Sequence, residues 1–215
     1  MVGCRRSRVM VDCGLDWLRA VWRIRPRPHA IVLTHAHPDH AWGLRNGAPC
    51  PVYAPKQTWD RLTRFAIEDK RLLPLRRPYE VDGIVFEAFP VEHSILAPAV
   101  GYRITAGHSR IFYVPDVVYI RDRSAALKAV SLFIGDGASI HRPLVRRRGH
   151  KLIGHAPVSA QLTWGRIARI KRAIITHCGS EIVSAHARAA AAVRALGEQR
   201  GVDAAIAFDG MEVVI

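Results

Sequence analysis

The sequence has no long apolar run and no N-terminal apolar segment. Its longest apolar runs, such as 189–193, fall far short of the roughly 20 residues that a transmembrane helix needs. Asp12 and Asp16 follow the early arginines, so the N-terminal region has no signal-peptide core. These absences predict that the chain has no transmembrane helix and that it is cytoplasmic.

Cysteine is scarce. The chain has only Cys4, Cys13, Cys50 and Cys178, and no two of them form a CxxC pair. This spacing excludes a disulfide framework and a zinc site built from thiolates. We therefore expect four free thiols.

Acidic residues are also few. The chain has 18 Asp and Glu against 32 Lys and Arg, which gives a formal net charge of +14. Basic side chains neutralise phosphates, so the charge leaves a nucleic-acid partner open. The basic residues are spread along the chain, however, which a compositional bias toward Arg would also produce. The one dense run, 146–151, is open to two interpretations, a solvated loop or an anion-gathering rim.

The remaining composition is typical of a globular protein, with 49% hydrophobic and 23% charged residues in 215. No low-complexity linker divides the chain, so we expect a single domain over residues 1–215. Periodicity predicts strands at 9–11, 30–33, 52–54, 84–89, 100–104, 110–114, 131–134, 173–176, 204–207 and 212–215. It predicts helices at 17–21, 58–68, 124–129, 158–166 and 181–196. This order indicates an α/β fold, with helices outside and sheets inside.

The densest cluster of metal-capable side chains follows the predicted strand 30–33, in the segment THAHPDH. It contains His35, His37, Asp39 and His40. Imidazole and carboxylate are the ligands that zinc and similar ions prefer. Four ligands around one ion would be crowded in so short a segment. Two adjacent ions are the economical interpretation, with His35 and His37 on one and Asp39 and His40 on the other.

Three more candidate ligands follow other predicted strands. His93 comes after the strand 84–89, Asp116 after 110–114 and His177 after 173–176. A carboxylate at the position of Asp116 can bridge two ions. The strand-then-Thr-His pattern at His35 recurs weakly at His177, which suggests two halves that present histidines at equivalent strand ends.

These motifs resemble the signature of the metallo-β-lactamase-fold hydrolase superfamily, which is HxHxDH followed by a separate His, a bridging Asp and a last His. The resemblance covers nearly the whole chain and implies a four-layer αββα sandwich, with the metal site at the edge of the two sheets. It implies that one ion takes His35, His37 and His93, and that the other takes Asp39, His40 and His177. Asp116 would be shared. The implied cofactors are two divalent ions, zinc by preference, with manganese or iron as alternatives.

The closest resemblance within the superfamily is to the compact phosphoribosyl cyclic-phosphate phosphodiesterase and tRNase Z-like branch. The segment between His93 and Asp116 is too short for the long arm with which typical tRNA-processing endonucleases grip tRNA. A bridging Asp at position 116 argues against the classical antibiotic-hydrolysing enzymes. The segment Gly154-His155 looks like a motif shared by the tRNA-processing and cyclic-phosphate enzymes. Asp136 lies where the tRNA enzymes carry a glutamate that supports that histidine.

The resulting hypothesis is a phosphodiesterase in which a metal-bridging hydroxide attacks phosphorus. Asp39 would orient the nucleophile, and His155, positioned by Asp136, would protonate the leaving alkoxide or stabilise charge on phosphate. Structural roles are open for His155, as a buried histidine near a Gly turn, and for Asp136, as a turn or cap residue. Asp12 could either orient a metal-bound histidine or serve only as a strand-end turn residue.

Two other functions are compatible with the same metal-binding residues. The site could hydrolyse a lactone, thioester or β-lactam, because such a hydroxide also attacks carbonyl carbon. Alternatively, the chain could be a basic metallo-domain that binds RNA without cutting it. The expected partner is a small phosphodiester or nucleotide-like substrate; nucleic acid and a second copy of the chain, forming a homodimer, stay open.

Overall fold

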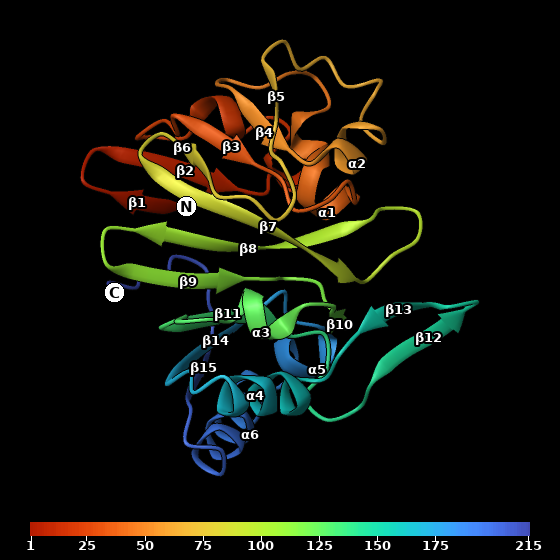
Figure 1. Cartoon of the computed structure of the whole chain (residues 1–215), viewed down its shortest axis with the longest axis vertical. Coiled ribbons are helices and arrows are strands. Elements are labelled where there is room, and N and C mark those ends of the chain that lie inside the picture. The colour runs from red at the N-terminus through yellow and green to blue at the C-terminus, as the bar shows by residue number, and fades with distance from the viewer. The chain divides into compact units, whose positions relative to one another are not determined.

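The computed structural model describes all 215 residues and divides into two compact units. Unit 1 comprises Met1–Pro90 and Leu96–Gly107, and unit 2 comprises Val91–Ile95 and His108–Ile215. Both units combine strands with helices (Figure 1). No helix combines the length and apolar character needed to cross a membrane. All four cysteines are free, as expected.

Unit 1 contains a five-stranded sheet in the order β1-β2-β3-β4-β5. Its strands are β1 (Val2–Cys4), β2 (Ser7–Val11), β3 (Ala30–Val32), β4 (Val52–Ala54) and β5 (Lys70–Leu72). β1 and β2 pair antiparallel, whereas β2 to β5 are parallel. β3 and β4 are buried along their whole length, which explains their uninterrupted apolar sequences.

Short helical segments follow these strands. They are the 3-10 helices η1 (Leu15–Trp17), η2 (Val21–Arg23) and η3 (Trp42–Leu44) and the helices α1 (Pro38–Ala41) and α2 (Lys56–Trp59). Their apolar residues join the sheet in one core cluster with Ile31, Leu33 and Leu44 at its centre, all fully buried. The strand β6 (Tyr79–Val81) pairs antiparallel with β7 (Ile84–Glu92), and β8 (Ala99–Ala106) completes this unit.

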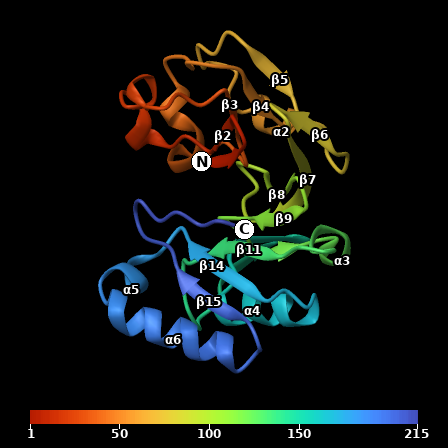
Figure 2. The ribbon, with the colours of Figure 1, turned by 90° about the vertical axis from the view of Figure 1, so that its left-hand side faces the viewer.

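Unit 2 contains four parallel strands in the order β9-β11-β14-β15. They are β9 (Ser109–Tyr113), β11 (Leu132–Asp136), β14 (Arg172–Thr176) and β15 (Asp203–Ile206). The helices are α3 (Arg123–Ala126), α4 (Val158–Ile167), α5 (Ser180–Val183) and α6 (His186–Glu198), and α4 and α6 pack beside this sheet (Figure 2). The short strand β10 (Tyr119–Ile120) pairs with the end of β7, so Glu92 is fixed to this unit.

A separate two-stranded ribbon, formed by β12 (Leu144–Arg148) and β13 (Lys151–His155), extends from unit 2 (Figure 1). The dense basic run therefore forms the outer end of a β-hairpin. The run is therefore paired in strands and is not an irregular loop, whereas its role as an anion-gathering rim stays a prediction. The short turn at Gly149-His150 joins the two strands.

Three predicted elements were wrong. The predicted helix 58–68 ends at Trp59, because Leu62 and Ile67 both pack into the core of unit 1. Residues five positions apart lie on different sides of a helix, so burying both requires an irregular chain. The predicted strand 212–215 pairs with no strand, and Val214 is 94% exposed. The predicted helix 17–21 is replaced by η1 and η2, since only Val21 is buried in this segment.

Two other helices are shorter than expected. The predicted helix 124–129 ends at Ala126. The predicted helix 181–196 is split into α5 and α6, because Ala185 has a non-helical backbone (φ −138°, ψ 48°).

Candidate functional site

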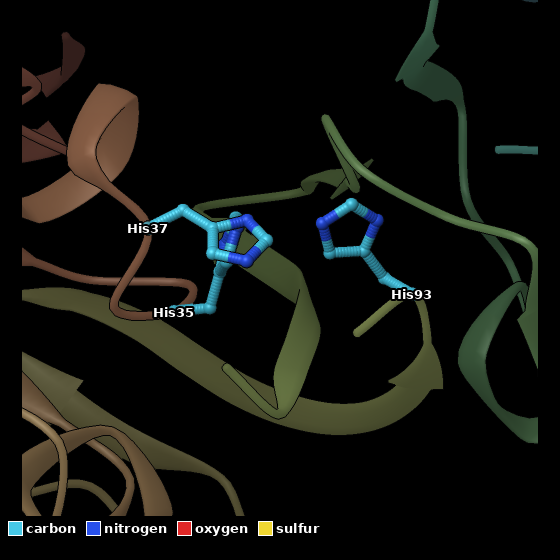
Figure 3. Close-up of side chains that lie close together, drawn as sticks. All are labelled: His35, His37 and His93. Atoms are coloured by element: carbon cyan, nitrogen blue, oxygen red, sulfur yellow. The ribbon is translucent and has the colours of Figure 1, made fainter. Parts of the chain in front are cut away.

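The histidine-rich segment leaves the carboxyl end of β3 and enters α1, both in unit 1. His35 is fully buried, and His37 is the residue that precedes the first turn of α1 with an extended backbone. Pro38 occupies the first helical position, where its fixed φ angle suits the helix start. Figure 3 shows the rings of His35 and His37 rising from this segment.

Asp12, at the end of the neighbouring strand β2, organises this segment. Its carboxylate accepts hydrogen bonds from the Thr34 backbone N–H at 2.7 Å and from the Thr34 hydroxyl at 2.9 and 3.0 Å. Its Oδ2 also lies 2.9 Å from Nδ1 of His40. Because the Thr34 hydroxyl donates to Asp12, its oxygen can accept from Nδ1 of His35, 3.0 Å away. Nδ1 of His40 is thus hydrogen-bonded to Asp12 directly, and Nδ1 of His35 is linked to Asp12 through Thr34.

Asp12 also serves as a strand-end turn residue, because its φ angle is +59°. The turn conformation and the contact with a histidine are therefore both present at Asp12, whereas metal binding by that histidine stays a prediction.

The ring nitrogens of His35 and His37 that do not contact Asp12 or Thr34 lie close together. Nε2 of His35 lies 3.0 Å from Nδ1 of His37. Two nitrogens bound to one zinc ion at about 2.0–2.1 Å each, in tetrahedral geometry, lie about 3.3 Å apart. The pair therefore fits a shared metal ion with little adjustment.

Asp39 and His40 form the second part of the unit 1 cluster. Nε2 of His40 lies 3.4 Å from Oδ2 of Asp39, and the Asp39 side chain is 59% exposed while that of His40 is buried. The carboxylate can therefore meet both His40 and a solvent-borne ligand. His35 and His40 also lie close, with ring centroids 4.2 Å apart.

In unit 2, His93 follows β7 and is held by the ribbon. The Nδ1–H of His93 donates to the Gly154 carbonyl at 3.0 Å, and the Gly154 backbone N–H donates to the His93 carbonyl at 2.9 Å. Burial lowers the pKa of His93, against the opposing effects of the Asp116 charge and the Gly154 carbonyl. Figure 3 shows the ring of His93. A neutral ring with Nδ1 occupied presents Nε2, the form in which histidine binds a metal.

Asp116 is the centre of the unit 2 cluster. Its Oδ1 lies 3.9 Å from Nε2 of His93, 3.4 Å from Nδ1 of His155 and 3.4 Å from Nδ1 of His177. Donor atoms of His93, Asp116 and His155 lie within 4.8 Å of one another, as do those of Asp136, His155 and His177. His177 has a left-handed backbone (φ +52°), which turns it sharply out of β14. Buried carboxylate next to three imidazoles is a donor set suited to a divalent ion.

Asp136 holds His155. The Nδ1–H of His155 donates to Oδ2 of Asp136 at 2.7 Å. Burial acts to lower the pKa of His155, but the hydrogen bond and charge of Asp136, together with Asp116, outweigh it and raise that pKa overall. Asp136 is fully buried and also accepts from the backbone N–H groups of Val117 and Ala138. These contacts fix the carboxylate and, through it, the imidazole of His155.

Three further residues support the site, namely Thr34, Gln161 and Gly154. The sequence motifs give no indication of the roles of Thr34 and Gln161. Gln161 is fully buried and its side chain bonds both backbone groups of Asp136 and the Ala156 carbonyl. A polar residue on the buried face of a predicted helix is the signal that identifies such a clamp. Gly154 has φ +116°, and a Cβ atom there would meet the Leu144 carbonyl oxygen at 1.8 Å. Only glycine therefore permits this hairpin geometry just before His155.

The structure thus gathers the predicted site residues into two clusters, one in each unit. Unit 1 holds His35, His37, Asp39 and His40, and unit 2 holds His93, Asp116, Asp136, His155 and His177. Both clusters combine imidazoles with carboxylates, and several imidazoles are fixed from behind, as residues that bind a metal usually are.

A family model described as "Beta-lactamase superfamily domain" matches residues 7–178. The chain belongs to the β-lactamase superfamily. The match includes residues of both units and every predicted metal ligand, from His35 to His177. No protein of curated function matches this superfamily member in sequence.

Solved structures show the same fold. The metallo-β-lactamase-fold protein YhfI from Bacillus subtilis matches with a TM-score of 0.73 at 16% identity, over 94% of this chain and 85% of YhfI. A diphosphatase of the PhnP family matches with a TM-score of 0.68 at 19% identity, over 96% of this chain and 79% of the diphosphatase. The short form of human tRNase Z matches with a TM-score of 0.64 at 18% identity, over 98% and 89%.

These matches confirm the predicted superfamily and its α/β fold. The superfamily member is a metallohydrolase with His and Asp groups that could bind metal. The assignment of each ligand to an ion, and the roles of Asp39, His155 and Asp136, stay predictions.

Proposed function

We propose that this chain is a phosphodiesterase that uses two divalent ions. By the superfamily pattern, one ion takes His35, His37 and His93, and the other takes Asp39, His40 and His177. Asp116 is shared between them. When bound, such ions act as Lewis acids and lower the pKa of coordinated water toward neutrality.

The chain's own residues prepare the ligands for this role. Asp12 directs Nδ1 of His40 and, through Thr34, Nδ1 of His35, so that Nε2 of each ring faces away from the carboxylate. The Gly154 carbonyl does the same for His93. Hydrogen bonds of this kind fix the ring orientation and raise the basicity of the ligand.

The observation that carries the proposal is the His155–Asp136 pair. A histidine whose Nδ1–H is held by a buried carboxylate keeps Nε2 available for substrate. His155 also lies 3.4 Å from Asp116, next to the proposed ligands. We propose that His155 donates a proton to the leaving alkoxide or stabilises charge on phosphate, while Asp39 orients the attacking water. Asp136 is the residue that positions His155.

Two neighbours in structure support phosphorus as the reacting centre. One is named as a diphosphatase and another as a tRNase. The fold itself supports several chemistries, so this support is by analogy. Zinc is the proposed metal because imidazole predominates in both clusters.

A substrate panel tests the proposal. The protein is reconstituted with zinc or manganese and assayed with bis-p-nitrophenyl phosphate, a 2′,3′-cyclic nucleotide, a lactone and nitrocefin. We expect turnover of the phosphodiesters, abolished in His37→Ala and retained in the control His108→Ala, whose residue is exposed in a turn of unit 2.

Metal content, measured by inductively coupled plasma mass spectrometry, should fall in His37→Ala only. Turnover of the lactone or nitrocefin without phosphodiester turnover would overturn the proposal in favour of carbonyl chemistry. Absence of all turnover in the metal-loaded protein would overturn it in favour of a non-catalytic role.

A further inference from the structure

The β12–β13 ribbon carries its basic residues in an ordered row. Opposite residues of an antiparallel pair lie on the same face, as do residues two apart along a strand. Arg148 pairs with Lys151, and Arg146 pairs with Ile153. Arg146, Arg148 and Lys151 therefore share one face of the ribbon, and Arg147 points to the other.

This row leads toward His155. The next pair of the same series, about 7 Å further along the ribbon, is Leu144 with His155. The distance between successive residue pairs on this face is comparable to the distance between successive phosphates of an extended nucleic-acid strand. The ribbon thus begins at His155, the residue proposed to act on the scissile phosphodiester. Its basic side chains lie at increasing distances from that residue.

The base of the ribbon is anchored to unit 2, although its outer end projects from the unit (Figure 1). Gly154 exchanges two hydrogen bonds with His93, and the Leu152 backbone N–H donates to Oε2 of Glu92 at 2.8 Å. The Ala156 backbone N–H donates to the Val117 carbonyl at 2.7 Å. These contacts fix the direction of the cationic row relative to His93 and His155.

No acidic side chain within the ribbon offsets its charge. The sequence contains no Asp or Glu between Asp136 and Glu181. The neighbouring carboxylate of Glu92 is engaged by the Leu152 N–H and by Arg121 at 3.1 Å. Arg146, Arg148 and Lys151 are all exposed. The positive potential of the ribbon is therefore available to a ligand.

A hollow of about 530 Å³ lies along the inner half of the ribbon. Arg142 and Arg146 line it together with the apolar side chains of Leu144 and Ile153. Two guanidinium groups beside an apolar floor suit a phosphate joined to a sugar, because guanidinium binds phosphate through paired N–H donors.

We propose that the β12–β13 ribbon binds the sugar–phosphate backbone of a nucleic-acid strand and directs that strand to His155. This inference rests on the proposed phosphodiesterase function and names its substrate class, an oligonucleotide in place of a small diester. The ribbon carries no Phe, Tyr or Trp and several basic residues, so its main contacts are expected to be with phosphates, which carry no sequence information. A membrane surface is a poorer fit, since the turn Gly149-His150 offers no large apolar residue for insertion.

Binding is tested apart from catalysis, with the full chain in EDTA and a fluorescein-labelled single-stranded oligoribonucleotide of mixed sequence. Fluorescence anisotropy gives the affinity between about 50 and 200 mM salt. The variant Arg146→Gln/Arg148→Gln/Lys151→Gln should bind at least about tenfold more weakly. Its slope of log K against log salt should be shallower by about 2, because each lost phosphate contact on a single strand removes about 0.7.

A matched control removes the same charge elsewhere in unit 2. Arg166→Gln/Arg188→Gln/Arg194→Gln changes exposed residues of α4 and α6. It should keep the salt slope of the unmodified protein. Equal weakening in both variants would assign binding to net charge and overturn the proposal.

Two further outcomes would also overturn the proposal. One is the absence of measurable RNA binding by the unmodified protein. The other is ribbon-dependent binding to vesicles of anionic phospholipid but not to RNA. Circular dichroism of each variant establishes that it is folded. EDTA removes the ions that the proposed reaction needs, so the binding assay does not depend on turnover. Failure of the phosphodiesterase assay would leave the binding result standing, and loss of binding would leave that assay unaffected.

Discussion

Oδ2 of Asp12 lies 2.9 Å from Nδ1 of His40, although 28 positions separate the two residues in sequence. The same carboxylate accepts from the backbone and hydroxyl of Thr34, which in turn contacts His35. One side chain at the end of β2 therefore determines the orientation of two proposed metal ligands.

Removing the Asp12 charge should weaken metal binding. Asp12→Asn loses the anionic acceptor for His40, and loss of such a partner typically lowers metal affinity about 10- to 100-fold. Competition with a chromophoric zinc chelator measures the change. Asp82→Asn is a matched control, because Asp82 also has a positive φ angle (+50°) and also contacts a histidine Nδ1, that of exposed His29 at 2.8 Å. Equal metal affinity in Asp12→Asn and the unmodified protein would contradict the role of Asp12.

Loss of His155 should impair catalysis more than metal binding. General acid catalysis contributes about 10²- to 10⁴-fold, so His155→Ala should lower phosphodiester turnover by that order. Metal content should be retained, because His155 is not among the proposed ligands. A leaving group of low pKa needs little protonation, and a smaller loss on p-nitrophenyl esters than on alkyl esters is expected. Unchanged turnover on both would remove His155 from the mechanism.

The ribbon should not tolerate a side chain at Gly154. In Gly154→Ala the Cβ atom would meet the Leu144 carbonyl oxygen at 1.8 Å, and the φ angle of +116° is unfavourable for alanine. The contact is with backbone, so β12 and β13 must separate, with a loss of several kcal/mol in stability. Gly149→Ala is the control, because no atom lies within 4 Å of its Cβ position and only the strain of about 1–2 kcal/mol applies. Thermal unfolding measures both, and similar melting temperatures would contradict the packing argument.

Stability should decrease in alkali because of Cys13. Burial, with smaller effects of Asp12 and Cys50, raises the pKa of the Cys13 thiol from 9.0 to about 12. The unfolded chain ionises this thiol first, so the stabilisation is complete below pH 9 and is lost between pH 9 and 12. At pH 10.5 the loss from this residue is about 2 kcal/mol.

Urea unfolding at pH 8 and pH 10.5 measures this loss. Between the two pH values, the free energy of unfolding should decrease less in Cys13→Ala than in the unmodified protein. In Cys4→Ala it should decrease as much as in the unmodified protein. An identical pH dependence in Cys13→Ala and the unmodified protein would show that the Cys13 thiol ionises alike in the folded and unfolded states.

Local patterns in the sequence were sufficient for much of the structure. The buried strands β3 and β14 and the helix α4 follow from apolar runs and helical periodicity, which depend on near neighbours. The dense motif at His35 to His40 identified a metal-capable segment, and the strand ends at His93, Asp116 and His177 were recognisable for the same reason.

Only the tertiary structure decided which groups hold these residues in place. The contacts of Asp12 with His40, of Gly154 with His93 and of Asp136 with His155 join residues 19 to 61 positions apart. Such contacts depend on strand order and register, which no short segment encodes. The same reason applies to the basic run. Its charge was evident from the sequence, but pairing across the β12–β13 hairpin placed Arg146, Arg148 and Lys151 on one face. Side chains alternate between the two faces of a strand, and only the pairing register decides which residues of the two strands share a face.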